Sequence, residues 1–296
     1  MNAEHQPIII CSTIAEMHAH IARAREAGDT IGCVPTMGYL HEGHASLIRA
    51  AAQKHRFVVA SIFVNPTQFG PSEDFERYPR DLERDLAVLQ GAGATHLFLP
   101  DVQEMYPDGI RSTIHLSGVT EVLEGAFRPT HFDGVATVVA RLFQAMLPDE
   151  AFFGQKDLQQ TLVIKQLVQT SSDPAVHSTR VTVMPTIREA DGLAKSSRNV
   201  YLNADDRRDA VVIYKALESA RSAILSGHVS CEAAERLMRE TLSTVPRLQI
   251  DYAAAVDAET LRTESGRMPN EIALCIAAKL GNTRLIDNML VQITPA

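Results

Sequence analysis

The chain has 296 residues, of which 45% are hydrophobic and 22% are charged, a composition typical of globular proteins and unlike that of disordered or collagen-like chains. No hydrophobic run approaches the ~20 residues that a membrane-spanning helix needs. Lys and Arg number 28 against 36 Asp and Glu, so the formal net charge is −8, which disfavours a general nucleic-acid-binding protein. A local basic pocket for an anionic ligand is compatible with this charge.

The cysteines and the N-terminal residues indicate the cellular compartment in which the protein is expected. Residues 1–7 carry no basic stretch followed by an apolar core, so we expect no signal peptide. No two cysteines form a C-x-x-C pair, and their spacing matches neither a zinc site nor a disulfide framework; they are Cys11, Cys33, Cys231 and Cys275. These features predict a reduced, cytoplasmic protein without membrane attachment.

Strand and helix patterns alternate through the first 187 residues. Ser12 or Thr13 is expected to cap a first helix that ends near Gly28. Strands are expected at 30–36, 57–64, 95–99, 151–153 and 180–185, and further helices at 44–53, 81–89, 135–146 and 158–168. The strand at 57–64, FVVASIFV, is almost continuously apolar, as expected of a strand buried on both faces of a parallel sheet. This alternation predicts a doubly wound, Rossmann-like α/β domain.

The pattern changes after residue 187. Two long helices are expected at 205–225 and 232–242, followed by short strands at 251–256, 272–277 and 284–288. Helices followed by strands indicate a smaller α+β unit. We therefore expect two domains, 1–187 and 188–296.

The segment PTMGYLHEGH, residues 35–44, lies where a predicted buried strand turns into a helix. Gly38 and Gly43 allow the backbone to approach a ligand closely, and the N–H groups at a helix start favour phosphate. His41 and His44 lie three residues apart, on one helix face, and H-x-G-H in this place indicates nucleotidyl transfer. The alternative is a pair of surface histidines that cap a helix. A zinc site would need a third ligand, and none is evident nearby.

Two further segments carry polar side chains suited to a small ligand. Asn65 and Gln68 follow the 57–64 strand, where ligands of open α/β sheets bind, although Asn-Pro is also common turn chemistry. Arg128 can bind a phosphate or carboxylate through two hydrogen bonds, and its alternative interpretation is a solvated loop arginine.

The remaining candidate segments carry cations. Lys156 stands at a predicted helix start, an unfavourable place for a cation unless an anion lies beside it. Gln160 can reach the same pocket. The segment READGLAKSSRN, residues 188–199, places two cations around two serines and suits nucleotide phosphates. Its alternative interpretation is a polar linker between domains.

Together these motifs closely resemble those of the pantoate–β-alanine ligase family. The resemblance runs from about residue 8 to 294 and rests on PTMGYLHEGH, SIFVNPTQFG, LEGAFRPTHFDGVATVV, FFGQKDLQQ, READGLAKSSRNVYL and RLIDNM. It implies a nucleotide- and pantoate-binding first domain, a lid-like second domain and a cytoplasmic homodimer. The implied reaction joins pantoate to β-alanine with ATP and Mg²⁺ through a pantoyl adenylate, and gives pantothenate, AMP and pyrophosphate.

The resemblance also implies roles for individual residues. His44, His41 and Lys156 would be catalytic, with His44 as proton donor. Gln68 and Gln160 would hold pantoate, and Gln68 would also approach β-alanine. From their residue types, we add Asn65 and Arg128 as candidate substrate-binding residues. Asp85 would be associated with magnesium, although the neighbouring position, an acid in some members, is Arg84. The ATP site would comprise Met37, Gly38, Tyr39, Leu40, His41, Glu42, Gly43, His44, Gly154, Gln155, Lys156, Asp157, Ile187, Lys195, Ser196, Ser197 and Arg198.

Two departures from the family pattern stand out. Gln155 replaces a common Glu and is expected to contribute through its backbone only. Lys195 replaces a common Met or Leu, and either adds a cation to the phosphate loop or points to solvent.

Two other functions compete with ligation. One is a different H-x-G-H nucleotidyltransferase with a phosphate-bearing acceptor, which would need more cations around the acceptor. The other is a nucleotide-binding regulatory protein without catalysis, against which the retained His41, His44 and Lys156 argue.

Overall fold

The structure is a computed structural model that describes residues 7–70, 73–227, 229–263 and 269–293. The expectation that no signal peptide is present rests largely on residues 1–6, which lie outside the described residues. The chain divides into two compact units. The first comprises residues 1–120, 128–154 and 160–185, and the second comprises 121–127, 155–159 and 186–296. Residues 121–127 and 155–159, which lie far from the C-terminus in sequence, therefore belong to the same unit as the C-terminal residues.

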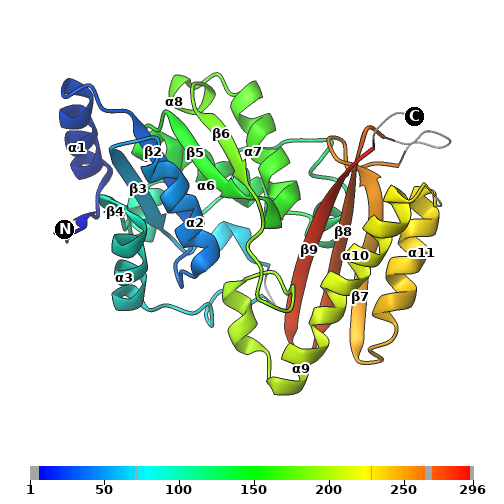
Figure 1. Cartoon of the computed structure of the whole chain (residues 1–296). Helices are drawn as coiled ribbons and strands as arrows, with labels where there is room; N and C mark the ends of the chain where they lie inside the picture. Colours follow the sequence, from blue (N-terminus) through cyan, green and yellow to red (C-terminus); the bar gives the residue numbers. More distant parts are fainter. Residues whose placement is uncertain (1–6, 71–72, 228, 264–268, 294–296) are drawn as a thin grey trace. The chain divides into compact units, whose positions relative to one another are not determined.

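The first unit is built on a six-stranded sheet in which every pair of neighbours is parallel. The order is β1-β4-β3-β2-β5-β6 (Figure 1). The strands are β1 (Ile9–Cys11), β2 (Ile31–Thr36), β3 (Phe57–Ile62), β4 (His96–Phe98), β5 (Glu150–Gly154) and β6 (Arg180–Met184). This topology confirms the predicted doubly wound α/β fold.

Helices cover both faces of this sheet because its strands are apolar on both sides. Val58 and Ala60 of β3 pack into one cluster with α2 (Glu42–Ala52) and α3 (Leu82–Ala92). Phe57 and Val59 point to the opposite face and pack with α1, α6 and α7. The bounds of these three helices are α1 (Ile14–Glu26), α6 (His131–Met146) and α7 (Leu158–Thr170). The first unit also contains the short helices α4 (Val102–Met105) and α8 (Pro174–His177) and the 3-10 helix η1 (Pro66–Gln68). Thr13 caps α1, as predicted.

The strand order locates the ligand-binding edge of the first unit. From β2 the chain adds β3 and β4 on one side, and it then returns to place β5 and β6 on the other. The order therefore reverses between β2 and β5. Ligands of such sheets bind beyond the carboxyl ends of the strands at this reversal, which are Thr36 of β2 and Gly154 of β5.

The second unit is a three-stranded antiparallel sheet with helices packed on one face. The strands are β7 (Leu248–Asp257), β8 (Glu271–Leu280) and β9 (Thr283–Gln292). Leu274 and Ile276 of β8 pack in one core with Leu217 and Met238. The helices are α9 (Ala204–Asp209), α10 (Val211–Leu225) and α11 (Cys231–Leu242), and the unit also contains α5 (Glu124–Phe127) and the 3-10 helices η2 (Gln155–Asp157) and η3 (Ser197–Tyr201).

Several predicted boundaries were wrong. The helix expected at 205–225 is two helices, α9 and α10, because a four-residue turn, closed by the bond from the Ile213 N–H to the Ala210 carbonyl, tightens the chain between them. The strands β8 and β9 extend to a two-residue hairpin, since Leu280 pairs with Thr283. Polar residues near that hairpin hid the strand pattern. Helices α2 and α6 also begin two and four residues earlier than expected.

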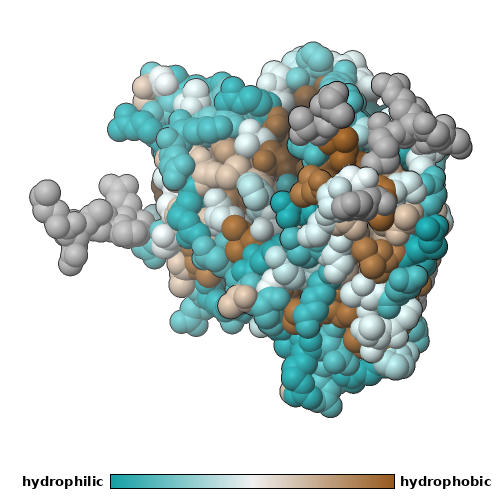
Figure 2. Space-filling view, turned by 45° about the vertical axis from the view of Figure 1, so that its right-hand side comes forward, coloured by the Kyte–Doolittle hydropathy of each residue, from teal (hydrophilic) through white to brown (hydrophobic). Residues whose placement is uncertain are grey.

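Hydrophobic side chains on the face shown in Figure 2 form separate patches among hydrophilic ones. Such a mixture is usual for a protein surface. Across the described residues, no helix combines the length and the apolar character that crossing a membrane requires.

Candidate functional site

The turn that follows β2 is held by a buried carboxylate. Gly38 and Tyr39 both adopt positive φ, 82° and 50°. Asp85 of α3 accepts the N–H groups of Tyr39 at 2.8 Å and of Leu40 at 2.6 Å. The Arg84 guanidinium lies 4.5 Å from the centre of the Tyr39 ring. Asp85 is 2% exposed, and burial raises the pKa of its carboxyl group above the usual range. Asp85 therefore acts as the anchor of this turn.

His41 and His44 cap helix α2 reciprocally. The His41 ring accepts the N–H of Gly43 at its Nδ1, at 3.1 Å, and the His44 ring accepts the N–H of His41 at its Nδ1, at 3.2 Å. The two ring centres lie 4.1 Å apart. Because Nδ1 accepts in both rings, the proton of each neutral imidazole lies on Nε2. Both rings therefore cap α2, and this capping directs their Nε2–H groups away from the capped N–H groups.

Asn65 and Gln68 lie on the turn after β3. Asn65 is 1% exposed; its Oδ1 accepts from the Tyr106 hydroxyl at 2.6 Å and from Thr67, and its Nδ2 donates to the Gly134 carbonyl at 3.2 Å. This amide caps η1 and so orders the turn that carries Gln68. The Gln68 side chain is half-buried.

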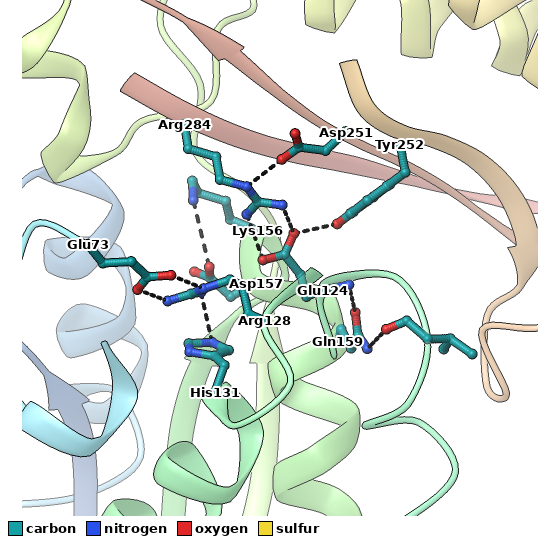
Figure 3. A network of polar contacts seen from close by, with 11 residues as sticks. Glu73, Glu124, Arg128, His131, Lys156, Asp157, Gln159, Asp251, Tyr252 and Arg284 are labelled. Atoms are coloured by element: carbon teal, nitrogen blue, oxygen red, sulfur yellow. Dashed lines mark hydrogen bonds and ion pairs between the residues drawn. The ribbon is translucent and has the colours of Figure 1, made fainter. Parts of the chain in front are cut away.

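Arg128 binds a carboxylate of the chain itself. Its Nε and Nη2 donate to the two oxygens of Glu73 at 2.7 and 2.6 Å (Figure 3). Its Nη2 also donates to the Gln68 carbonyl at 3.2 Å. Burial alone would raise the pKa of Glu73, but the Arg128 guanidinium lowers it below the usual range. His131 contacts the same Gln68 carbonyl through Nδ1 at 3.0 Å. Arg128 therefore supports the backbone of Gln68.

In the second unit, η2 carries Lys156 against strand β9. Asn288 donates through Nδ2 to the carbonyls of Gln155 at 2.9 Å and of Lys156 at 2.8 Å. Its Oδ1 accepts from the Gln155 side chain at 3.3 Å, so the side chain of Gln155 also contacts β9. The Lys156 side chain is 20% exposed and lies 3.7 Å from Asp157.

The loop at 188–198 is pinned by Arg188. Its guanidinium donates to both oxygens of Asp287, at 2.6 and 3.0 Å, and to the Gly192 carbonyl at 3.0 Å. Gly192 has a φ of +95°, and a Cβ there would lie 2.1 Å from the Tyr214 ring, so only glycine fits. Burial raises the pKa of Asp287 although Arg188 opposes the shift.

Lys195 forms an ion pair with Glu189 at 2.8 Å. The Lys195 ammonium is therefore paired with a carboxylate of its own loop, and its place beside the ATP phosphates stays a prediction. The backbone N–H of Lys195 donates to the Ile187 carbonyl at 3.0 Å. Ser196 caps η3 through the N–H of Arg198, and Ser197 is buried.

Helix α5 is tied to the second sheet by a buried charge network (Figure 3). Arg284 donates to both Glu124 oxygens and to Asp251, each at 2.7 Å. The Tyr252 hydroxyl donates to Glu124 at 2.8 Å, and burial together with the Glu124 charge raises the pKa of Tyr252. A β-bulge between Ile250 and Tyr252 allows Asp251 and Tyr252 to reach the same network.

Comparison with known proteins decides the family. The family model described as pantoate-beta-alanine ligase matches residues 9–290. A curated pantothenate synthetase of Moorella thermoacetica is 49% identical over 96% of this chain and 99% of that protein, and one of Herpetosiphon aurantiacus is 48% identical over 95% and 99%.

This chain belongs to the pantoate–β-alanine ligase family.

Solved structures agree with this assignment. The crystal structure of pantothenate synthetase from Thermus thermophilus matches with a TM-score of 0.88 at 47% identity. The match covers 95% of this chain and 99% of the Thermus chain. A pantoate–β-alanine ligase from Francisella tularensis, described as complexed with beta-gamma ATP and beta-alanine, has a TM-score of 0.77 at 34% identity, with 98% and 100% covered. The chain is thus an enzyme, a pantoate–β-alanine ligase by family.

The predicted site residues of this ligase divide between the two units. The first unit contains residues 37–44, Asn65, Gln68, Asp85, Arg128, Gly154 and Gln160. The second contains residues 155–157, Ile187 and residues 195–198. Within each unit, hydrogen bonds connect many of these residues as described above.

Sequence reasoning missed the residues that hold these segments in place. Glu124, Arg188, Arg284, Asp287 and Asn288 all lie in motifs that carry the family resemblance, yet none was given a role. For Arg284, Asp287 and Asn288, the signal that could have identified them is a charged or amide residue inside a predicted strand, as in RLIDNM, because such residues are buried only when they are paired.

Proposed function

We propose that the chain joins pantoate to β-alanine in two steps at the residues assigned above. First, a pantoate carboxylate oxygen attacks the α-phosphorus of ATP, the bond to the β-phosphate bridging oxygen breaks, and pyrophosphate leaves. The β-alanine nitrogen then attacks the carbonyl carbon of the pantoyl adenylate, AMP leaves with the electron pair of the broken C–O bond, and the amine loses a proton. The observation that carries this proposal is the H-x-G-H turn beyond β2, at the strand-order reversal, in a member of this ligase family.

We assign the phosphates of ATP to the Nε2–H groups of His41 and His44 and to the ammonium of Lys156. The caps on α2 support the histidine assignment, because they orient both rings without using Nε2 as the capping atom. Donors held in place before the reaction stabilise developing charge at no reorganisation cost. The assignments of residues 195–198, Gly154 and Ile187 to ATP rest on their motifs.

We assign pantoate to Gln68 and Gln160, which are neutral donors and acceptors. Asn65 and Arg128 contribute by ordering the turn that carries Gln68, since their polar groups bond to that turn and to Glu73. A neutral pocket suits a small monoanion better than a phosphate-bearing acceptor.

Mg²⁺ enters this proposal with ATP. Protein-bound Mg²⁺ keeps several waters and takes one or two carboxylates together with substrate phosphates. Asp85 is 2% exposed, and both its oxygens accept backbone N–H groups. Among the described residues, no group of three or more His, Cys, Asp or Glu suits a metal ion. The residues do not fit a metal held by the protein, so we propose that Mg²⁺ arrives as the ATP complex and that Asp85 orders the turn.

On the family resemblance we also propose a cytoplasmic homodimer, and sedimentation equilibrium of the full chain can test the dimer. The chemistry itself is tested by pyrophosphate exchange. Labelled pyrophosphate should enter ATP when pantoate and Mg²⁺ are present and β-alanine is absent, and exchange should stop without pantoate. A requirement for β-alanine, or ADP as the nucleotide product of the full reaction, would contradict the two-step adenylation.

A further inference from the structure

Strand β9 presents its polar residues to two different faces of the second sheet. Leu285 and Val291 pack in the core with α10 and α11. Because side chains alternate along a strand, Asp287 points to this helix side and Asn288 to the opposite one. The contacts agree, since Asp287 binds Arg188, while Asn288 binds η2.

Asn288 bonds to backbone atoms on either side of the Lys156 Cα. It is 4% exposed, and its Nδ2 donates to the carbonyls of Gln155 and Lys156 at 2.9 and 2.8 Å. An amide nitrogen has two hydrogens, so both are used. These two bonds hold the peptide groups that set the direction of the Lys156 side chain, independently of that side chain's own contacts.

The position of Asn288 is itself held by Asp287. The Asn288 N–H donates to Asp287 Oδ1 at 2.8 Å, and Asp287 is paired with Arg188, whose Nη2 also donates to the Asn288 carbonyl at 3.2 Å. By contrast, η2 has only three residues, and so short a turn has little rigidity of its own. The more rigid partner in this contact is therefore the strand.

We propose that Asn288 is a positioning residue that sets the place of the Lys156 ammonium by binding the backbone of η2. The proposal rests on the phosphate-binding role proposed for Lys156. A misplacement of about 1 Å in a reacting group can cost about 10²-fold in rate, so loss of the two bonds should slow adenylation without removing any group that touches substrate.

The test is a double-mutant cycle on pantoate-dependent pyrophosphate exchange in the full chain. Asn288→Ala should lower the maximal exchange rate by about 10–100-fold and leave the KM for pantoate nearly unchanged. Lys156→Ala should also lower the rate. In the Lys156→Ala background, Asn288→Ala should cost almost nothing more, because a residue that acts through Lys156 has no effect once Lys156 is absent. Because the assay follows the label that enters ATP, the exchange rate of a slow variant can still be measured.

Asn203→Ala is the matched control. Asn203 also uses its amide to order backbone in the second unit, since it caps α9 through the N–H groups of Asp205 and Asp206. Its loss should lower the melting temperature but leave the exchange rate within about twofold, in either background. A merely structural role for Asn288 would give the same pattern as Asn203.

The outcomes separate the two proposals. If Lys156→Ala leaves exchange unchanged, the role proposed for Lys156 is wrong, and with it the inference about Asn288. If Lys156→Ala slows exchange but Asn288→Ala has no effect, or slows both backgrounds equally, only the inference is overturned. Where Asn288→Ala does not fold, Asn288→Asp replaces it, because a carboxylate has the same shape but cannot donate. If neither folds, Asn288 is structural and the inference is wrong.

Discussion

Arg284 donates to both carboxylate oxygens of Glu124, at 2.7 Å each, across 160 residues of sequence. The pair is buried, with side chains 21% and 8% exposed, and Tyr252 and Asp251 form further hydrogen bonds with it. Residues 121–127 thereby belong to the second unit although they lie in the first half of the chain. The Arg284–Glu124 pair therefore attaches residues 121–127 to strand β9.

Removing Arg284 should destabilise the protein strongly. Arg284→Met leaves the Glu124 carboxylate buried without its counter-charge, which typically costs about 3 kcal/mol. The matched control is Arg262→Met, because Arg262 pairs with Glu121 of the same segment at 3.4 Å, with both side chains more than half exposed. That exposed pair should be worth at most about 1 kcal/mol. Urea unfolding of both variants measures the difference, and equal losses would show that the buried pair does not anchor α5.

Substitutions of His44 can separate capping from catalysis. His44→Ala removes both the Nδ1 cap and the Nε2–H donor, whereas His44→Asn keeps an acceptor near the Nδ1 position and lacks Nε2. Both should slow pyrophosphate exchange about 10²–10³-fold, but only His44→Ala should lose about 1 kcal/mol of stability through the cap. A nearly normal rate in His44→Asn would assign His44 to the cap alone.

Gly134 and Gly91 should respond to alanine in opposite ways. Both lie within helices, where Gly→Ala usually stabilises by up to about 1 kcal/mol. A Cβ at Gly91 meets nothing within 4 Å, whereas one at Gly134 would lie 2.3 Å from the Thr67 carbonyl oxygen and 3.0 Å from the Gln68 nitrogen.

Gly134→Ala should therefore lose about 1–3 kcal/mol and should reduce pantoate-dependent exchange at least about tenfold by shifting the turn that carries Gln68. Gly91→Ala should be as stable as the parent or more so, with normal exchange. Thermal unfolding and the exchange assay report both effects, and normal exchange in a folded Gly134→Ala protein would argue against the role of this turn.

Stability should fall in mildly acidic solution because of His96. Burial, with a smaller contribution from His20, lowers the pKa of His96 from the usual 6.5 to about 4. Above pH 6.5 the ring is neutral in both folded and unfolded chains, so it causes no pH dependence. Between pH 6.5 and 4 only the unfolded chain takes up the proton, so stability falls as pH falls, by at most about 3 kcal/mol, and this contribution levels off below pH 4.

His96→Gln tests this contribution by urea unfolding at several pH values. The variant loses the stacking of His96 on Phe57, at 3.9 Å, so it should be less stable at pH 7.5. Its further loss between pH 6.5 and 4 should be smaller than that of the parent. The exposed His177 provides the control, since His177→Gln should keep the parent's pH dependence. If His96→Gln keeps it as well, another group is responsible.

Features that depend on neighbours in sequence were predictable. Thr13 caps α1 because the Thr-x-x-Glu pattern acts within one helical turn. The strand at 57–64 was recognised because a strand buried on both faces carries apolar residues continuously. The H-x-G-H segment was correctly placed at a strand-to-helix turn because the strand pattern before it and the helix pattern after it are both local in sequence.

Partners that are distant in sequence were not predictable. Nothing in the sequence indicated that Arg128 would pair with Glu73, 55 residues away. Nor did anything in it indicate that the Asp85 oxygens would accept N–H groups 45 and 46 residues earlier. A charged or amide side chain shows in sequence what it can bind, and only the packing of distant segments decides which partner reaches it.

The sequence by itself therefore determined the fold class, the family and the residue types available for chemistry, because these follow from local periodicity and from motifs. The tertiary structure alone decided which of those residues hold other segments in place, as Asp85 and Asn288 do through backbone groups and Arg284 does through the Glu124 carboxylate. The physical reason is that a buried polar group must be paired, and its partner is set by which strands and turns the folded chain brings together.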